Sequence, residues 1–173
     1  MSVIVVDIEA DGPIPADFSM ISFGAVIVDK TLEKSFYGEL KPISENWEPS
    51  ALKISGFTRE QTLTFDEPQT VMQDFKKWID QNSDGRPLFY SDNNGFDWMF
   101  MHWYFIHFLG ESPFGYSSTN IGSLYKGLVK DVFKNFKHLR KTNHSHHPVD
   151  DAKGNAEALL TMATEMELNL GDY

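Results

Sequence analysis

Four consecutive β-branched aliphatic residues, Val3 to Val6, stand near the start of the chain. A run of this kind is typical of a strand that is buried on both faces of a sheet. The strand continues into Asp7, Ile8 and Glu9, and because side chains alternate along a strand, Asp7 and Glu9 share one face. Two carboxylates side by side at the edge of an apolar core repel each other, and a divalent cation would relieve that repulsion. An isolated Asp-x-Glu is more often a solvated strand end, so this motif needs support from elsewhere in the chain.

Three further apolar segments and one short extended segment predict the remaining strands. They are residues 18–28, 34–40 and 87–91, and a short stretch that ends the loop at 110–120. The connections between the first three strands are short, which indicates that these strands are antiparallel neighbours.

Apolar residues that recur at spacings of three and four predict amphipathic helices. The predicted helices span 67–79, 96–109, 124–139 and 149–166, and the third is interrupted near Asp131. Residues 42–65 are polar and irregular, except that Thr58 to Gln61 has the spacing of a capping box, which predicts the start of a short helix. The order of the elements predicts an α/β fold with a mixed five-stranded sheet flanked by helices.

Aromatic residues make the helix at 96–109 strongly apolar on one side. We interpret this stripe as core rather than as a platform for stacking bases; it comprises Phe100, Met101, Tyr104, Phe105 and Phe108. The roles of Phe57 and Trp98 are left undecided, since each residue fits either base stacking or the core.

The composition is that of a packed globular protein. With 173 residues, 41% of them hydrophobic, we predict a single domain over residues 1–173. The chain has no cysteine, so thiolate metal sites and disulfides are excluded, and a metal would be held by carboxylates and histidines. No apolar run approaches the length of a membrane span and no charged leader precedes the first strand. We therefore expect a soluble, cytoplasmic protein without membrane contact.

Charge argues both for and against a nucleic-acid partner. The formal net charge is −10, whereas surfaces that bind phosphates are usually basic. However, six of the fifteen basic residues fall between Lys126 and Lys141, against the single acid Asp131. This segment is either a solvated face or a guide for the phosphates of a strand.

Acidic residues stand at the ends of three predicted elements. Asp7 and Glu9 close the first strand, Asp97 opens the helix after the fourth strand, and Asp151 lies in the first turn of the last helix. In α/β sheets, ligands gather where strands end and the following helices begin. The four carboxylates are therefore expected to converge.

These motifs resemble the DEDDh branch of the 3′-to-5′ exonuclease superfamily, whose members share an RNase H-like fold. The first motif of that family is matched by Asp7 to Glu9, the second by Asn93 to Asp97, and the third by His146 to Ala152. Residues 54–58 also resemble the family's turn before its substrate-side helix. The similarity covers essentially the whole chain, in the family's order.

The resemblance implies a phosphodiesterase that uses two divalent cations. Asp7, Glu9 and Asp151 would hold one ion, Asp7 would bridge to the second, and Asp97 would bind that second ion directly or through water. Hard oxygen ligands suit Mg²⁺ or Mn²⁺. His146 would act as the general base on the attacking water, from a loop that is expected to be mobile until substrate binds.

Neighbouring residues compete for several of these positions. The family register selects His146 over His147 and His144, Asp151 over Asp150, and Asp97 over Asp92. A metal cluster made only of the histidines at 144–147 is the less favoured alternative. His144 is expected to be solvated, and the remaining histidines, His102, His107 and His138, are interpreted as packing or surface residues.

The resemblance implies an exonuclease that hydrolyses phosphodiester bonds at single-stranded 3′ ends and releases nucleoside 5′-monophosphates. RNA is slightly favoured over DNA, because the compact chain resembles stand-alone bacterial or phage exoribonucleases. The alternatives are an enzyme that cleans short oligonucleotides and a non-catalytic nucleic-acid-binding module of the same fold; a homodimer is left open. Family members commonly carry Thr after the Glu, whereas this chain has Ala10, so a hydroxyl near the 3′ nucleotide is missing.

Overall fold

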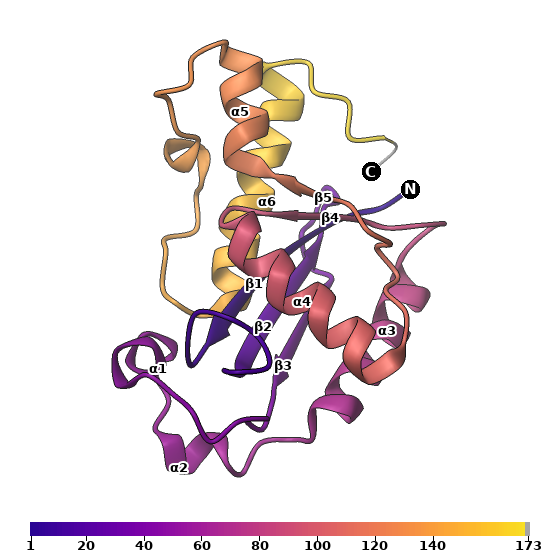
Figure 1. Ribbon diagram of the computed structural model, residues 1–173. Helices are drawn as coiled ribbons and strands as arrows, with labels where there is room; N and C mark the ends of the chain where they lie inside the picture. The colour runs from indigo at the N-terminus through magenta and orange to yellow at the C-terminus, as the bar shows by residue number, and fades with distance from the viewer. Residues whose placement is uncertain (172–173) are drawn as a thin grey trace.

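The computed structural model describes residues 1–171 and contains a five-stranded mixed sheet (Figure 1). The strands are β1 (Val3–Ala10), β2 (Met20–Ile27), β3 (Ser35–Glu39), β4 (Leu88–Ser91) and β5 (Ser118–Asn120). Their order across the sheet is β3-β2-β1-β4-β5. β2 is antiparallel to both β1 and β3, whereas β4 is parallel to both β1 and β5. The predicted mixed sheet with antiparallel neighbours at its start is confirmed.

Helices cover both faces of this sheet. They are α1 (Pro49–Ser55), α2 (Arg59–Thr62), α3 (Pro68–Asn82), α4 (Asn94–Leu109), α5 (Ile121–Val129), a 3-10 turn η1 (Lys137–Leu139) and α6 (Pro148–Glu165). α3 and α4 pack against one face, and α5 and α6 lie together against the other (Figure 1).

The central strand β1 contributes to both cores. Ile4, Val6 and Ile8 pack with α3 and α4, while Val3 and Val5 pack with α5 and α6. These five side chains are at most 4% exposed, so the predicted doubly buried strand is confirmed. Alternation places Asp7 and Glu9 on the side of α6. The aromatic stripe of α4 is core, as expected, with Phe100, Met101, Tyr104 and Phe105 fully buried.

Two predictions for the helices were wrong. Residues 42–65 contain α1 in addition to the expected capping-box helix α2, in which Thr58 and Gln61 form both hydrogen bonds of the box. The helix predicted at 124–139 begins earlier, at Ile121, and ends at Val129, so the interruption predicted near Asp131 is confirmed but the α-helix does not resume after it. Lys130 adopts the left-handed conformation (φ 56°), which terminates α5, and only the short turn η1 follows. Within the described residues, no helix is both long and apolar enough to cross a membrane.

Candidate active site

The paired carboxylates lie at the C-terminal end of β1. Asp7 and Glu9 are both partly exposed, and Ile8 between them is buried on the opposite face. Gly24 of β2 pairs directly with Asp7. A Cβ at Gly24 would lie 2.3 Å from the backbone nitrogen of Val149, so only glycine lets the start of α6 come this close to the sheet. The sheet therefore brings the first turn of α6 next to Asp7.

Asp97 approaches from the first turn of α4. This helix begins at Asn94, directly after the end of β4, whose neighbour in the sheet is β1. Asp97 is 2% exposed, and its Oδ2 is buried without a hydrogen-bond partner. An unpaired buried carboxylate oxygen is costly, and a cation is one way to satisfy it.

Asp151 approaches from the first turn of α6 and is 1% exposed. Its Oδ1 lies 2.9 Å from Nη2 of Arg140 and 2.8 Å from Nδ1 of His144. The competing Asp150 is exposed and accepts a hydrogen bond from the hydroxyl of Ser145 at 3.1 Å. The site therefore contains Asp151, while Asp150 faces solvent.

The segment that carries His146 is hydrogen-bonded to α6 at both ends. The backbone N–H groups of Ser145 and His146 donate to the carboxylate of Asp151 at 3.3 and 3.1 Å. At the other end, the carboxylate of Glu157 accepts from the backbone and the hydroxyl of Thr142 at 2.7 and 2.9 Å. We call residues 142–147 the histidine loop. These bonds fix its backbone.

His146 itself has a left-handed backbone (φ 60°), and its side chain is exposed. One ligand atom from each of His144, His146 and Asp151 lies within 4.8 Å of the others. His144 is exposed, as expected, with 56% of its side chain accessible, and its Nδ1 also contacts Asp151. His147 stacks on Tyr37 with ring centroids 4.9 Å apart.

Burial and the charges of neighbouring carboxylates raise the pKa of Asp7, Glu9 and Asp97. Burial raises the pKa of Asp7 well above its usual value, and the charges of Asp97, Asp151 and Glu9 raise it further. Burial, followed by the charge of Asp151, raises the pKa of Glu9 to about 7. Burial also raises the pKa of Asp97 to about 8. The four expected carboxylates are therefore close enough to repel one another.

This arrangement fits a bound divalent cation. Burial and repulsion both oppose ionisation of Asp7, Glu9 and Asp97, and a cation reverses both effects. The unpartnered Oδ2 of Asp97 offers a free ligand atom. The donors are all carboxylate oxygens, which suit a hard cation.

A hollow of about 230 Å³ adjoins Glu9. Ala10 lines it from the end of β1, Gly12 from the loop that follows, Ile54 from α1, and Phe96 from α4. Its walls are largely apolar, and it opens directly beside the carboxylates.

The two aromatic residues that were left open as base-stacking candidates pack against other rings of the protein. Trp98 packs on Phe89 and His102, with ring centroids 5.0 and 4.7 Å apart, and Phe57 packs on Phe65 at 4.9 Å. The two other histidines also contact aromatic rings: His107 stacks on Trp103 at 4.3 Å, and His138 meets Tyr125 edge-on at 5.8 Å.

Sequence reasoning missed two residues of the site, Arg140 and Phe96. In the sequence, Arg140 was noted only as one of the basic residues between Lys126 and Lys141. No known motif links an arginine at this spacing to Asp151. Phe96 lay inside the second motif, next to Asp97 at the start of a helix, where ligands gather in α/β folds, but it was given no role of its own.

Comparisons with known proteins agree with this geometry. Residues 4–159 match the RNase_T family model, described as "Exonuclease". The Escherichia coli protein named 3′-5′ DNA exonuclease Cap18 is 39% identical over 127 residues, which cover 71% of this chain and 67% of that protein.

Solved nucleases share the fold. The structure of cell-death related nuclease 4 (CRN-4) has a TM-score of 0.75 at 16% identity, and the match covers 94% of this chain and 64% of that one. The zinc-bound complex of E. coli exonuclease I with single-stranded DNA has a TM-score of 0.70 at 16% identity, and the match covers 96% of this chain and 41% of that one. The chain thus spans less than two thirds of either protein. The expected RNase H-like exonuclease fold is confirmed, and none of these similarities supports the homodimer that was left open.

Proposed function

The chain belongs to the exonuclease family that the RNase_T model describes, and we propose that it is a metal-dependent 3′-to-5′ exonuclease acting on single-stranded DNA. The observation that carries this proposal is the convergence of four carboxylates from three elements, in which the charges of Glu9, Asp97 and Asp151 raise the pKa of Asp7. Residues 1–173 would form one exonuclease domain.

DNA replaces RNA as the proposed substrate. The expected slight preference for RNA has no support from the comparisons, because the curated relative is named a DNA exonuclease. In addition, a structure with the same fold is a complex with single-stranded DNA. The proposed products are nucleoside 5′-monophosphates.

Asp7, Glu9, Asp97 and Asp151 would hold the divalent cations, and Mg²⁺ or Mn²⁺ suits their oxygen ligands. When bound, such cations stabilise the negative charge that develops on the phosphate during hydrolysis. Asp151 has a second task in this chain, because the same carboxylate binds Arg140 and the histidine loop. It would thereby couple cation binding to the position of His146.

His146 would accept the proton from the water that attacks the terminal phosphodiester. Its exposed ring leaves it free to meet substrate, and its backbone N–H is held by Asp151 at 3.1 Å. The bond from phosphorus to the 3′ oxygen of the preceding nucleotide then breaks, and that oxygen takes a proton. The released nucleotide keeps its 5′-phosphate.

The hollow beside Glu9 would take the 3′-terminal nucleotide. Phe96 and Ile54 provide apolar surface for its base, and Glu9 and Ala10 form the wall nearest the carboxylates. A base enclosed on apolar and aromatic side chains is held largely without regard to sequence. Ala10 offers no hydroxyl here, so hydrogen bonds to the sugar would have to come from other groups.

The test uses DNA and RNA strands of the same sequence, each blocked at the 5′ or the 3′ end, with Mg²⁺ or Mn²⁺. The expected result is stepwise release of 5′-monophosphates from free 3′ ends of DNA, and no release with EDTA or with the variant Asp7→Asn. Release from 5′ ends, faster hydrolysis of RNA, or activity that survives EDTA would each contradict the proposal. Strand binding without turnover would identify a non-catalytic module.

A further inference from the structure

The segment between α5 and η1 presents an aromatic side chain to solvent. Phe133 is 93% exposed and its neighbour Val132 is 68% exposed, whereas Phe136 is 1% exposed and packs into the core with Tyr125. The backbone N–H of Phe133 donates to Oδ1 of Asp131 at 2.9 Å, so a local turn directs this residue outward. Phe133 lines the same hollow as Tyr125 and Val129, and contiguous apolar surface of this kind, rather than a single exposed side chain, marks a binding surface.

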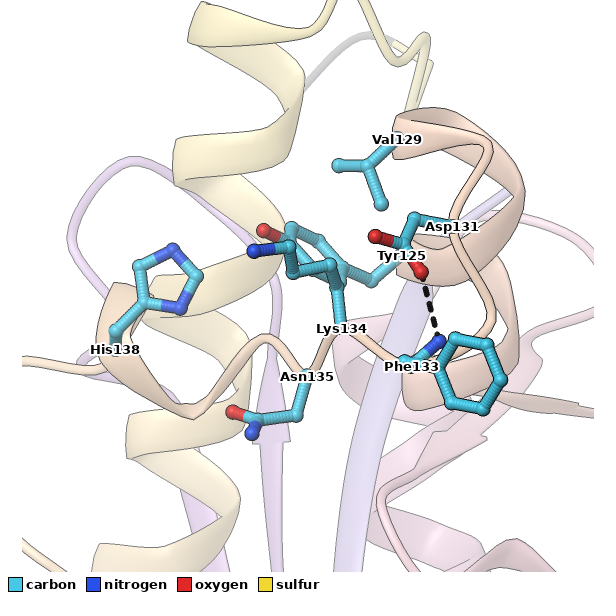
Figure 2. A pocket seen from close by; sticks show the side chains of 7 residues that line it. All are labelled: Tyr125, Val129, Asp131, Phe133, Lys134, Asn135 and His138. Atoms are coloured by element: carbon cyan, nitrogen blue, oxygen red, sulfur yellow. Dashed lines mark hydrogen bonds between the residues drawn. The ribbon is translucent and has the colours of Figure 1, made fainter.

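A hollow of about 540 Å³ lies beside Phe133 (Figure 2). Tyr125 and Val129 of α5 supply its apolar surface, and Lys134, Asn135 and His138 supply polar atoms. Asp131 adds one carboxylate, whose Oδ1 accepts the hydrogen bond from the backbone N–H of Phe133. Figure 2 shows the side chain of Lys134 in front of Tyr125, with its ammonium group on the side of His138. The hollow therefore combines aromatic surface with a cationic group and hydrogen-bonding groups.

The charge around this hollow is opposite to that of the whole chain. Six of the fifteen basic residues lie between Lys126 and Lys141, in a protein of net charge −10. The segment also leads to the active site: Lys137 Nζ lies 3.4 Å from Asp92 at the start of α4, and Arg140 binds Asp151. In Figure 1 this segment descends from the end of α5 to the start of α6.

We propose that Phe133 and this hollow bind a base of the single strand a few nucleotides upstream of its 3′ end, while Lys134 and Lys137 contact the intervening phosphates. This inference rests on the proposed function and extends it to the part of the strand outside the catalytic site. Stacking on an aromatic ring together with cationic contacts to the backbone is how proteins hold single strands of any sequence. In an acidic protein, a local cluster of lysines also fixes the direction in which the strand leaves.

The experiment compares hydrolysis of a DNA dinucleotide with that of a long oligothymidylate. Phe133→Ala is expected to lower kcat/KM for the long strand roughly five-fold or more relative to the dinucleotide. The matched control Tyr116→Ala removes another exposed aromatic side chain (85%), which lies before β5 and does not line the hollow beside Phe133. The ratio of the two kcat/KM values should not change in this control.

Salt dependence provides the second readout, measured by fluorescence anisotropy of the long strand in the Asp7→Asn background. Removing one lysine that binds a phosphate should reduce the slope of log K against log salt concentration by about 0.7. Lys134→Ala should show this reduction, and Lys77→Ala on α3 should not.

The outcomes separate the two proposals. If the unsubstituted protein hydrolyses no DNA, the proposed function fails. If it hydrolyses DNA but Phe133→Ala leaves the ratio between long and short substrates unchanged, only the upstream site is wrong. Binding of an acidic peptide in place of the strand would likewise leave that ratio unchanged and overturn the inference.

Discussion

The guanidinium of Arg140 lies 2.9 Å from the carboxylate of Asp151, and only 8% and 1% of the two side chains are exposed. Gly154, one turn further along α6, makes room for this pair, because a Cβ there would lie 2.6 Å from Nε of Arg140. The charge of Arg140 also lowers the pKa of Asp7, against the larger effect of burial that raises it. Arg140 thus supplies part of the positive charge that the buried carboxylates require.

Replacing Arg140 with Met is expected to destabilise the metal-free protein by roughly 3–5 kcal/mol, because it leaves the buried carboxylate of Asp151 without the guanidinium that balances its charge. Urea unfolding in EDTA measures this loss, and addition of Mg²⁺ should restore part of it. The control is Lys77→Met, which breaks an ion pair of the same length, 2.9 Å, whose side chains are 68% and 56% exposed. That change should cost less than about 1 kcal/mol. An equal cost for both variants would mean that Arg140 is not the partner that stabilises Asp151.

The close approach of β2 and α6 gives a second prediction. A methyl group at Gly24 would collide with the backbone at Pro148 and Val149, so Gly24→Ala should shift the start of α6 and with it Asp151. We expect a loss of about 1–3 kcal/mol in stability and a fall in kcat of roughly 10²-fold, the effect of a displacement near 1 Å in a catalytic group. Chemical unfolding and single-turnover kinetics measure the two effects.

Gly127→Ala is the matched control for that substitution. Gly127 lies inside α5, and nothing lies within 4 Å of the position its Cβ would occupy. Alanine is the better helix former by up to about 1 kcal/mol, so this variant should be as stable as the parent or more so, with unchanged kcat. Comparable damage from both substitutions would show that the close approach at Gly24 is not required.

Periodicity and motif spacing were sufficient to predict the sheet and the four carboxylates. Val3 to Val6 could only be a buried strand, and Asp7, Glu9, Asp97 and Asp151 each stand at an element boundary that the pattern defined. The choice of His146 rests on the family spacing to Asp151 and stays a prediction.

Other features depended on tertiary contacts that no local pattern records. α1 buries only Leu52, so its apolar periodicity was too weak to detect, although Pro49 at its start and Gly56 after its end were a usable signal. The helix predicted through residue 139 stops at Val129, because Lys130 turns left-handed and Phe136 enters the core. Arg140 is separated from Asp151 by the whole histidine loop, and only the folded chain brings them together.

The carboxylates of the site predict how stability depends on pH without metal. Burial raises the pKa of Asp97 to about 8 and that of Glu9 to about 7, whereas unfolded carboxyl groups titrate near ~4. Between these values the folded state binds more protons, so its free energy of unfolding should fall as pH rises from about 4 to about 8. Thermal melts in EDTA should therefore show a Tm that decreases across this range. Each kcal/mol lost from the free energy of unfolding should lower the Tm by about 2–4 °C.

Asp97→Asn tests the cause of that pH dependence. The amide cannot ionise, so the variant should have a higher Tm than the parent near pH 8 in EDTA. Its Tm should also change less with pH between about 4 and 8. Addition of Mg²⁺ near pH 8 should raise the Tm of the parent, and it should raise the Tm of the variant by a smaller amount. A parent Tm that rises with pH in EDTA would contradict the assignment of raised pKa values.

The last prediction concerns His146, whose left-handed backbone restricts the choice of substitution. Alanine at φ 60° would strain the histidine loop, whereas asparagine is one of the few residues that tolerate this conformation. His146→Asn therefore removes the base while preserving the hydrogen bond from its N–H to Asp151. We expect kcat to fall about 10²–10⁴-fold with little change in Tm.

His147→Asn is the matched control, because His147 occupies the N-cap of α6, where asparagine is a preferred residue. Single-turnover release of nucleotide from a 3′-labelled strand measures both variants, and a larger loss for His147→Asn would move the general base by one residue.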